Sequence, residues 1–383
     1  MRNIPYDVNL QGIIGEVRNL IPAVSSRIEE NFLAFFFGLI FSGTKSINEL
    51  ADWFGRKDQS TLNRILSNPK LNISNIFVKF QIWLREKLDF RKTTYLIIDD
   101  SFLCKSGKHM AGLAWGYNHS KGHVEFGQQA VLATVLNGEL ELPFFSEMYD
   151  KSAKNFKSKL DLAIFLFGRF FKFMGTRKFI VLFDSWYCCQ KLISVFPSFI
   201  GWVSKLRRNR RIDVGEGWVS LRDFLRSVNS WRYKSISVGG NEYWFYEFQA
   251  EVKNLGRLKL IAVKKSKYAR IVSAVIVTNL TEETTAVILQ HFKKRWEIEV
   301  CIKNTKQALG WNNCKVRGKN AIRRHWFILH LAHCFISSVK TRLCGAESSF
   351  KQVVNLLRKK LKINGRRLAA AISLNVSENF AKR

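Results

Sequence analysis

Acidic side chains follow two short apolar runs of this sequence, at points where strands are expected to end. Tyr95–Ile98 is followed by Asp99 and Asp100, and Lys178–Phe183 is followed by Asp184. In open α/β sheets, functional groups gather at the carboxyl ends of the strands. Two carboxylates on adjacent strands repel each other unless a divalent cation lies between them. A single aspartate at such a point is more often a turn cap, but the pair indicates a metal site.

A third acidic residue belongs to a helical pattern in the last third of the chain. Phe292, Arg295, Glu299 and Lys306 fall within a band of about 60° if the helix is continuous at about 100° per residue. Such a stripe is too polar for a core. It indicates either an exposed ion-pair ladder, since Arg295 and Glu299 are four residues apart, or a metal carboxylate flanked by phosphate-binding cations.

The spacing Phe292-x2-Arg295-x3-Glu299-x6-Lys306 resembles the Y-x2-R-x3-E-x6-K signature of bacterial insertion-sequence transposases of the DDE class. Phe292 replaces the usual tyrosine, which removes one hydroxyl that could contact a phosphate but leaves the metal chemistry unaffected. The resemblance extends over about residues 40–340. Further blocks that resemble the family are Ile97–Ser101, Lys105–Lys108, Arg295–Glu299, Lys306–Gly310, Val181–Tyr187 and Val277–Asn279.

The resemblance implies a ribonuclease-H-like domain whose catalytic triad is Asp, Asp and Glu, with a β insertion before the glutamate. Asp184 and Glu299 are then the second and third members. Asp99 and Asp100 point to opposite faces of their strand, so only one of them is expected to reach the metals. The catalytic aspartate of the family usually precedes Ser or Thr directly, and this selects Asp100.

Metal-dependent cleavage and strand transfer of DNA is the activity that the resemblance implies, with cut-and-paste transposition as the expected route. Two Mg²⁺ or Mn²⁺ ions would be held by Asp100, Asp184 and Glu299. The expected partners are terminal inverted repeats, target DNA and a second copy of the chain. The alternative is an inactive or domesticated DNA-binding regulator of transposon origin. The side chains expected to contact DNA are Lys105, Arg207, Arg208, Arg210, Phe292, Arg295, Trp296 and Lys306.

The charge of the chain agrees with a nucleic-acid partner. Its 383 residues include 62 Lys and Arg against 30 Asp and Glu, a formal net charge of +32. Excess like charge opposes compaction, so it indicates a polyanionic partner, and nucleic acid is favoured over a membrane surface. A hydrophobic content of 47% excludes a disordered chain.

The periodicity predicts an α/β fold, namely a ribonuclease-H-like mixed sheet interrupted by an all-β insertion, with helical N-terminal and C-terminal regions. Asn137-Gly138 predicts a hairpin, and a helix is expected over 155–174. The segments 49–54 and 61–66 resemble a helix-turn-helix, although ordinary helical hairpins share this pattern. The predicted regions are 1–90 (helical, DNA-binding), 91–204 (catalytic core, first part), 205–275 (all-β insertion), 276–325 (core, second part with the Glu helix) and 326–383 (basic, helical).

Cysteine spacing and apolar runs bear on the compartment. The seven cysteines form no CxxC pair, which is typical of reduced thiols in a cytosol. The runs Phe32–Phe41 and Leu162–Met174 are too short or too interrupted to cross a bilayer. A cytoplasmic protein without a membrane partner is therefore expected. His330, His333 and Cys334 lie in an apolar helical stretch, where a core position is more typical than a zinc site.

Overall fold

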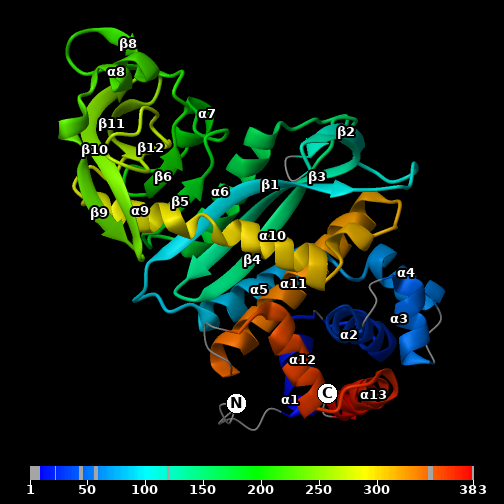
Figure 1. The fold of residues 1–383 in the computed structure, drawn as a ribbon. Coiled ribbons are helices and arrows are strands. Elements are labelled where there is room, and N and C mark those ends of the chain that lie inside the picture. Colours follow the sequence, from blue (N-terminus) through cyan, green and yellow to red (C-terminus); the bar gives the residue numbers. More distant parts are fainter. Residues whose placement is uncertain are drawn as a thin grey trace.

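One mixed sheet of twelve strands runs through the computed structural model, which describes residues 9–21, 23–42, 46–55, 59–118, 121–343 and 348–381 (Figure 1). The hydrogen-bonded order is β2-β3-β1-β5-β6-β12-β11-β10-β7-β8, with β4 beside β3 and β9 beside β10. The strands are β1 (Thr94–Cys104), β2 (Leu113–Asn118), β3 (His123–Asn137), β4 (Leu140–Tyr149), β5 (Ile180–Phe183), β6 (Gly201–Lys205), β7 (Arg211–Asp213), β8 (Trp218–Ser220), β9 (Lys234–Val238), β10 (Asn241–Val252), β11 (Gly256–Lys264) and β12 (Ala274–Thr278).

The centre of the sheet combines both strand directions. β1 pairs antiparallel with β3 and parallel with β5, and β5 pairs parallel with β6. The predicted hairpin is present, since Asn137 pairs with Leu140 around Gly138, whose φ of 61° suits a residue without a Cβ. A mixed sheet with helices at both ends of the chain confirms the predicted fold class.

β1 is longer than the apolar run that predicted it. All eleven of its residues pair with β3, so the ladder continues through Asp99 and Asp100 to Cys104. The sequence predicted the two aspartates at the carboxyl end of the strand. In the structure they lie inside it. β5 does end at Phe183, and Asp184 is the first residue after it.

The insertion is mainly β but contains a short helix. β7, β8, β9, β10 and β11 form its strands, and α8 (Leu221–Ser227) buries Leu221 and Leu225, which lie four residues apart on one helix face. The prediction of an all-β insertion was wrong in this detail. Its strands join the central sheet through β12, which pairs with both β11 and β6. In Figure 1 this part extends away from the helical ends of the chain.

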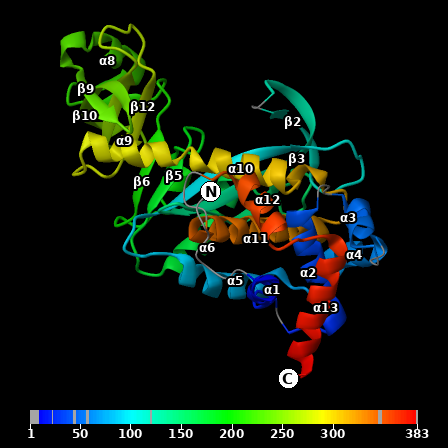
Figure 2. The ribbon, with the colours of Figure 1, turned by 60° about the horizontal axis from the view of Figure 1, so that its bottom comes forward.

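Helices from the two ends of the chain pack together into one helical body (Figure 2). α13 contacts α1, α2 and α3, and α11 contacts α2, α4 and α5. The predicted region boundaries at residues 90, 204, 275 and 325 remain a prediction. The helices of this body are α1 (Leu10–Arg18), α2 (Ser26–Phe41), α3 (Ile47–Phe54), α4 (Gln59–Ser67), α5 (Ile73–Lys87), α11 (Lys319–Leu343), α12 (Phe350–Lys360) and α13 (Gly365–Ala381).

Both apolar runs of the sequence are core helices. In α2 the rings of Phe36 and Phe37 pack edge-on against Phe335 of α11. The second run lies in α6 (Lys159–Met174), whose Phe170 and Phe173 contact Phe144 of β4. Among the helices described, none is both long and apolar enough to cross a membrane.

The helix-turn-helix-like segment forms two short helices. The Ser46 hydroxyl accepts a hydrogen bond from the Glu49 amide and so begins α3, and Gly55, with a φ of 69°, ends it. Residues 56–58 lie outside the described part of the chain. On α4 the side chains of Asn63 and Arg64 are exposed, as a DNA-reading helix requires.

Gly365 allows α13 to approach α3 closely. A Cβ at this position would meet the backbone carbonyl of Trp53. We expect Gly365→Ala to destabilise the protein by about 1–3 kcal/mol, because backbone cannot move aside as a flexible side chain can. The matched control is Gly168→Ala in α6, where nothing lies within 4 Å and alanine should stabilise by about 0.5–1 kcal/mol. Urea unfolding of both variants measures the difference, and equal effects would contradict the proposed contact.

Candidate active site

The parallel pairing of β1 with β5 brings two aspartates to the same level of the sheet. Ile98 lies opposite Phe183, so the next residues, Asp99 and Asp184, follow at matching positions on neighbouring strands. Side chains at matching positions of paired strands project from the same face. The sheet therefore places Asp99, and not Asp100, alongside Asp184.

Asp99 lies in an environment that disfavours its negative charge. Burial, followed by the nearby charge of Asp100 and, more weakly, that of Asp184, raises the pKa of the Asp99 carboxyl to about 7. The Arg295 guanidinium counteracts part of this effect, with its Nη1 3.7 Å from Asp99 Oδ2. Only 22% of the Asp99 side chain is exposed. Burial, more than any neighbouring charge, therefore favours the protonated form of this carboxyl in the absence of a cation.

Glu299 reaches the same region from a helix that is interrupted just before it. α9 (Thr285–Lys294) and α10 (Glu297–Ala308) are separated at Arg295 and Trp296, where the amides bond three residues back instead of four. The predicted single continuous helix was wrong at this point. The tighter turn does not separate the predicted pair, because Arg295 Nη2 lies 2.8 Å from Glu299 Oε1.

Arg295 thus joins the aspartate on β1 to the glutamate on α10. Its guanidinium contacts both Asp99 and Glu299, and only 17% of its side chain is exposed. Among the described residues, Asp99, Asp184 and Glu299 do not place oxygen atoms within 4.8 Å of one another as a set. The guanidinium occupies the space between the first and the third carboxylate.

Asp100 faces the opposite side of β1 and has a full set of partners there. Its Oδ2 accepts from Lys159 Nζ at 2.8 Å and from Gln129 Nε2 at 2.9 Å, and its Oδ1 accepts from the Tyr187 hydroxyl at 3.2 Å. Burial and the nearby carboxylates raise the pKa of Tyr187, so the phenol stays protonated and donates. These contacts do not support the selection of Asp100 over Asp99 as the first acid of the site.

The two lysines predicted to contact DNA are held by backbone carbonyl groups. Lys306 Nζ donates to the Phe102 carbonyl at 2.8 Å, and Lys105 Nζ donates to the carbonyls of Asn312 and Cys314 at 2.7 and 3.1 Å. Burial lowers the pKa of both lysines. Lys306 connects α10 to β1, and Lys105 connects the loop after β1 to the turn that follows α10. Each contact therefore helps to hold the helix that carries Glu299 in place.

The basic residues at the start of the insertion differ in exposure. Arg207 and Arg208 are exposed, while Arg210 is half-buried and its Nη2 donates to the Cys188 carbonyl at 2.7 Å. Cys188 lies four residues after Asp184. Arg210 therefore ties the insertion to the turn that carries the second acid. Arg207 and Arg208 lie at the surface, where Arg208 Nη1 donates to the Val272 carbonyl at 3.2 Å.

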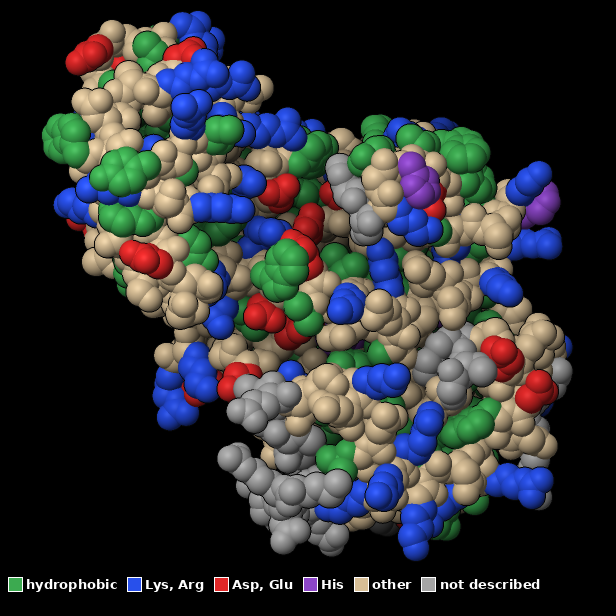
Figure 3. Space-filling model, viewed as in Figure 1, with side chains coloured by type: hydrophobic (Ala, Val, Ile, Leu, Met, Phe, Trp, Pro, Cys, Tyr) green, Lys and Arg blue, Asp and Glu red, His purple; other side chains and the backbone are tan. Residues whose placement is uncertain are grey.

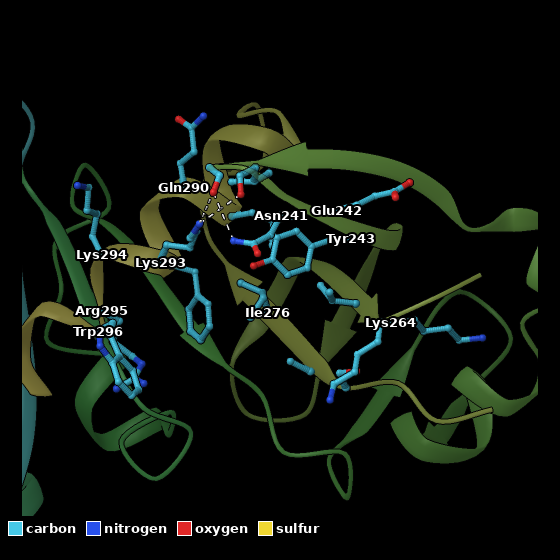
Figure 4. Close-up of a pocket in the computed structure, with 18 of the residues that line it drawn as sticks. Asn241, Glu242, Tyr243, Lys264, Ile276, Gln290, Lys293, Lys294, Arg295 and Trp296 are labelled. Atoms are coloured by element: carbon cyan, nitrogen blue, oxygen red, sulfur yellow. Dashed lines mark hydrogen bonds between the residues drawn. The ribbon is translucent and has the colours of Figure 1, made fainter. Parts of the chain in front are cut away.

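A cavity of about 1000 Å³ opens beside Arg295, between α9 and the β9–β10 hairpin (Figure 4). Its lining includes Tyr243, Phe292, Lys293 and Trp296. Lys293 Nζ donates to the Val238 carbonyl at 3.2 Å, which closes one side. The Trp296 ring is 60% exposed, and Phe292 is half-buried. The wall next to the acidic residues is thus aromatic and basic.

The space-filling view shows how charge is distributed on this side of the molecule. Figure 3 shows acidic side chains gathered between the β-rich insertion and the rest of the molecule, with Lys and Arg side chains on both sides. A negatively charged floor with positively charged margins fits a polyanion that reaches metal-binding carboxylates.

Several residues of this site were missed by sequence reasoning. Lys159 and Gln129 support Asp100, and no local motif marks them, whereas the third partner, Tyr187, is the last residue of the Val181–Tyr187 block. The position of Asp99 did have a signal. Leu96-Ile97-Ile98-Asp99 and Val181-Leu182-Phe183-Asp184 are equivalent apolar runs that each end in aspartate, and aligning them as parallel neighbours pairs Asp99 with Asp184.

Comparison with known proteins places the chain in a family. A search of curated proteins found no match. The family model described as "Transposase DDE domain" matches residues 91–335, which include β1, β5, the insertion and α10. Because this match covers well over half of the chain, the protein belongs to the DDE transposases of insertion sequences.

Proposed function

We propose that this transposase cleaves DNA at the ends of its own element and joins them to a target, using the carboxylates of Asp99, Asp184 and Glu299. The observation that supports it most is the register of β1 and β5, which sets Asp99 level with Asp184 on the face that Arg295 links to Glu299. In this proposal Asp100 has a supporting role, because it binds Lys159, Gln129 and Tyr187 on the opposite face of β1.

The family generally uses a divalent metal, and the residues here fit one. The donor atoms are carboxylate oxygens, which Mg²⁺ and Mn²⁺ prefer. Burial and the neighbouring charges of Asp100 and Asp184 raise the pKa of Asp99, so a bound cation would stabilise the ionised carboxylate there. When bound, two such ions would supply the Lewis acid that activates a water or a 3′-hydroxyl and stabilises the leaving oxygen.

The remaining groups of the site would position DNA. Arg295 can leave the Asp99–Glu299 contact to hold a phosphate beside the scissile bond, because its planar fork suits a phosphate as well as a carboxylate. Trp296 offers an exposed ring, and Arg207 and Arg208 offer exposed charge on the insertion. Lys105 and Lys306 would act by holding β1 and α10 in place.

DNA is the partner that the family implies, and the finer points are proposals. We propose terminal inverted repeats and target DNA as substrates, a cut-and-paste route, a homodimer in the complex that pairs the two ends, and activity in the cytoplasm. The net charge of +32 supports tight, salt-dependent binding to DNA.

The test is Mg²⁺-dependent nicking of a duplex that carries the ends of the element, compared with a random duplex. Asp184→Asn should lower cleavage by about a thousandfold or more while end binding stays within about threefold, because the variant loses a metal ligand and no DNA contact. Asp223→Asn, at an exposed ion pair of the insertion, is the matched control and should cleave normally. Wild-type protein that binds the ends but never cuts them would instead support the alternative, a DNA-binding regulator.

A further inference from the structure

A second cluster of possible metal ligands lies inside the protein, away from the acids of the catalytic face. Glu141 is the second residue of β4, Cys301 lies on α10 and His333 lies on α11. One donor atom from each, an oxygen, a sulfur and a nitrogen, lies within 4.8 Å of the other two. Cys301 and His333 are fully buried, and 14% of the Glu141 side chain is exposed.

The hydrogen bonds around His333 fix which of its ring nitrogens carries the proton. The Thr305 hydroxyl has one hydrogen, which it donates to the Cys301 carbonyl at 2.8 Å. Its oxygen can then only accept from His333 Nδ1, 2.9 Å away, so Nδ1 is protonated. In the neutral ring, Nε2 therefore presents a lone pair.

That lone pair faces another acceptor. His333 Nε2 is 3.4 Å from Glu141 Oε1, and neither of these buried atoms has a hydrogen-bond partner. Two buried acceptors at this distance repel each other unless a cation or a proton lies between them. On the third side, Cys301 Sγ accepts from the Thr134 hydroxyl at 3.7 Å, and burial together with the interaction of its thiol with the Glu141 carboxylate raises the pKa of that thiol.

We propose that Glu141, Cys301 and His333 bind one structural Zn²⁺ ion. A set of carboxylate oxygen, imidazole nitrogen and thiolate sulfur is typical of zinc, whereas Mg²⁺ and Mn²⁺ prefer oxygen. Thr305 plays the outer role that metal-bound histidines usually have, because it holds the far nitrogen of the ring. Cys334 follows His333 directly but lies outside this set of three, and its thiol donates to the Pro143 carbonyl at 3.4 Å.

Zinc at this position would fasten the Glu299 helix to the core. Cys301 follows Glu299 by two residues on α10, while Glu141 belongs to the sheet and His333 to the long helix α11. Binding would release the thiol proton, replace the repulsion between Glu141 and His333 with two bonds, and connect three elements that lie far apart in the sequence.

The test is the metal content of the full-length protein, expressed with zinc in the medium and purified without chelators. Elemental analysis should find about one zinc per chain in the wild type, and Co²⁺ exchanged for it should show the near-ultraviolet charge-transfer band of a cobalt–thiolate bond. Cys301→Ala and Glu141→Gln should lose both signals. Cys188→Ala, a buried thiol outside the cluster, and Asp184→Asn, on the catalytic face, should keep both.

Two results would overturn the proposal. One is wild-type protein that contains no zinc after this preparation and shows no cobalt–thiolate band. The other is Cys301→Ala protein that keeps a full equivalent of zinc. The wild-type measurements decide the matter even if a variant fails to fold, and the retained zinc of Asp184→Asn separates this site from ions bound at the catalytic acids.

Discussion

Asp99→Asn should abolish DNA cleavage, while the same change at Asp100 should mainly lower stability. Asp99 shares its face of β1 with Asp184 and contacts Arg295, the partner of Glu299. Removing a metal-binding carboxylate should slow cleavage by about a thousandfold or more, equivalent to about 4 kcal/mol of transition-state stabilisation. Single-turnover nicking of end-bearing DNA in saturating Mg²⁺ measures this effect.

The two variants should also change stability in opposite directions. At pH 8 the ionised Asp99 carboxylate is disfavoured by burial and by its neighbours, so Asp99→Asn should stabilise the metal-free protein by about 1–3 kcal/mol. Asp100→Asn leaves the Lys159 ammonium without its ion pair, with only 17% of that side chain exposed, and should destabilise by about 1–3 kcal/mol.

Cleavage by the Asp100→Asn variant should stay within about tenfold of the wild type when compared below its unfolding temperature. Lys159→Met provides the matched control, because it removes the same ion pair from the other side and should destabilise to a similar degree. If Asp100→Asn abolished cleavage in a folded protein while Asp99→Asn cut DNA normally, the assignment of the two aspartates would be reversed.

The features of the fold that depend on neighbouring residues could be predicted from the sequence. The Asn137-Gly138 hairpin follows from turn chemistry, and the strands that carry Asp99 and Asp184 follow from apolar runs. The Arg295–Glu299 pair survives the break between α9 and α10, because four residues of tight helix still bring the two side chains together.

The hydrophobic pattern of β1 does not show which of its aspartates faces α10. Both faces of this strand are covered, so its apolar run does not alternate with polar residues, and only the alignment of its apolar run with that of β5 favours Asp99. Lys105 and Lys306 resemble surface cations in the sequence, yet each ammonium is held by carbonyl groups from another element. The Glu141–Cys301–His333 cluster combines residues from three elements, and no spacing rule connects them.

Metal binding at the catalytic face should strengthen steeply with pH. The pKa of Asp99 is about 7 in the folded, metal-free protein, so at pH 6 a cation must displace a proton from most molecules and at pH 8 from few. If one proton is released, the affinity for Mg²⁺ should rise about tenfold from pH 6 to pH 8. Calorimetric titration of Mg²⁺ at the two pH values measures it, and in Asp99→Asn this dependence should disappear.

The same carboxyl group should make the stability of the metal-free protein fall as pH rises. Its pKa in the fold is above the ordinary value of 3.8, so between about pH 4 and pH 7 the folded chain holds a proton that the unfolded chain has lost. Stability from this group is complete below pH 4 and lost as pH rises through 7. Thermal unfolding in the absence of divalent ions should show this slope in the wild type and in Lys159→Met, but not in Asp99→Asn. A wild-type slope unchanged by Asp99→Asn would mean that this carboxyl is already ionised at pH 6, and the expected gain in Mg²⁺ affinity would then have no source.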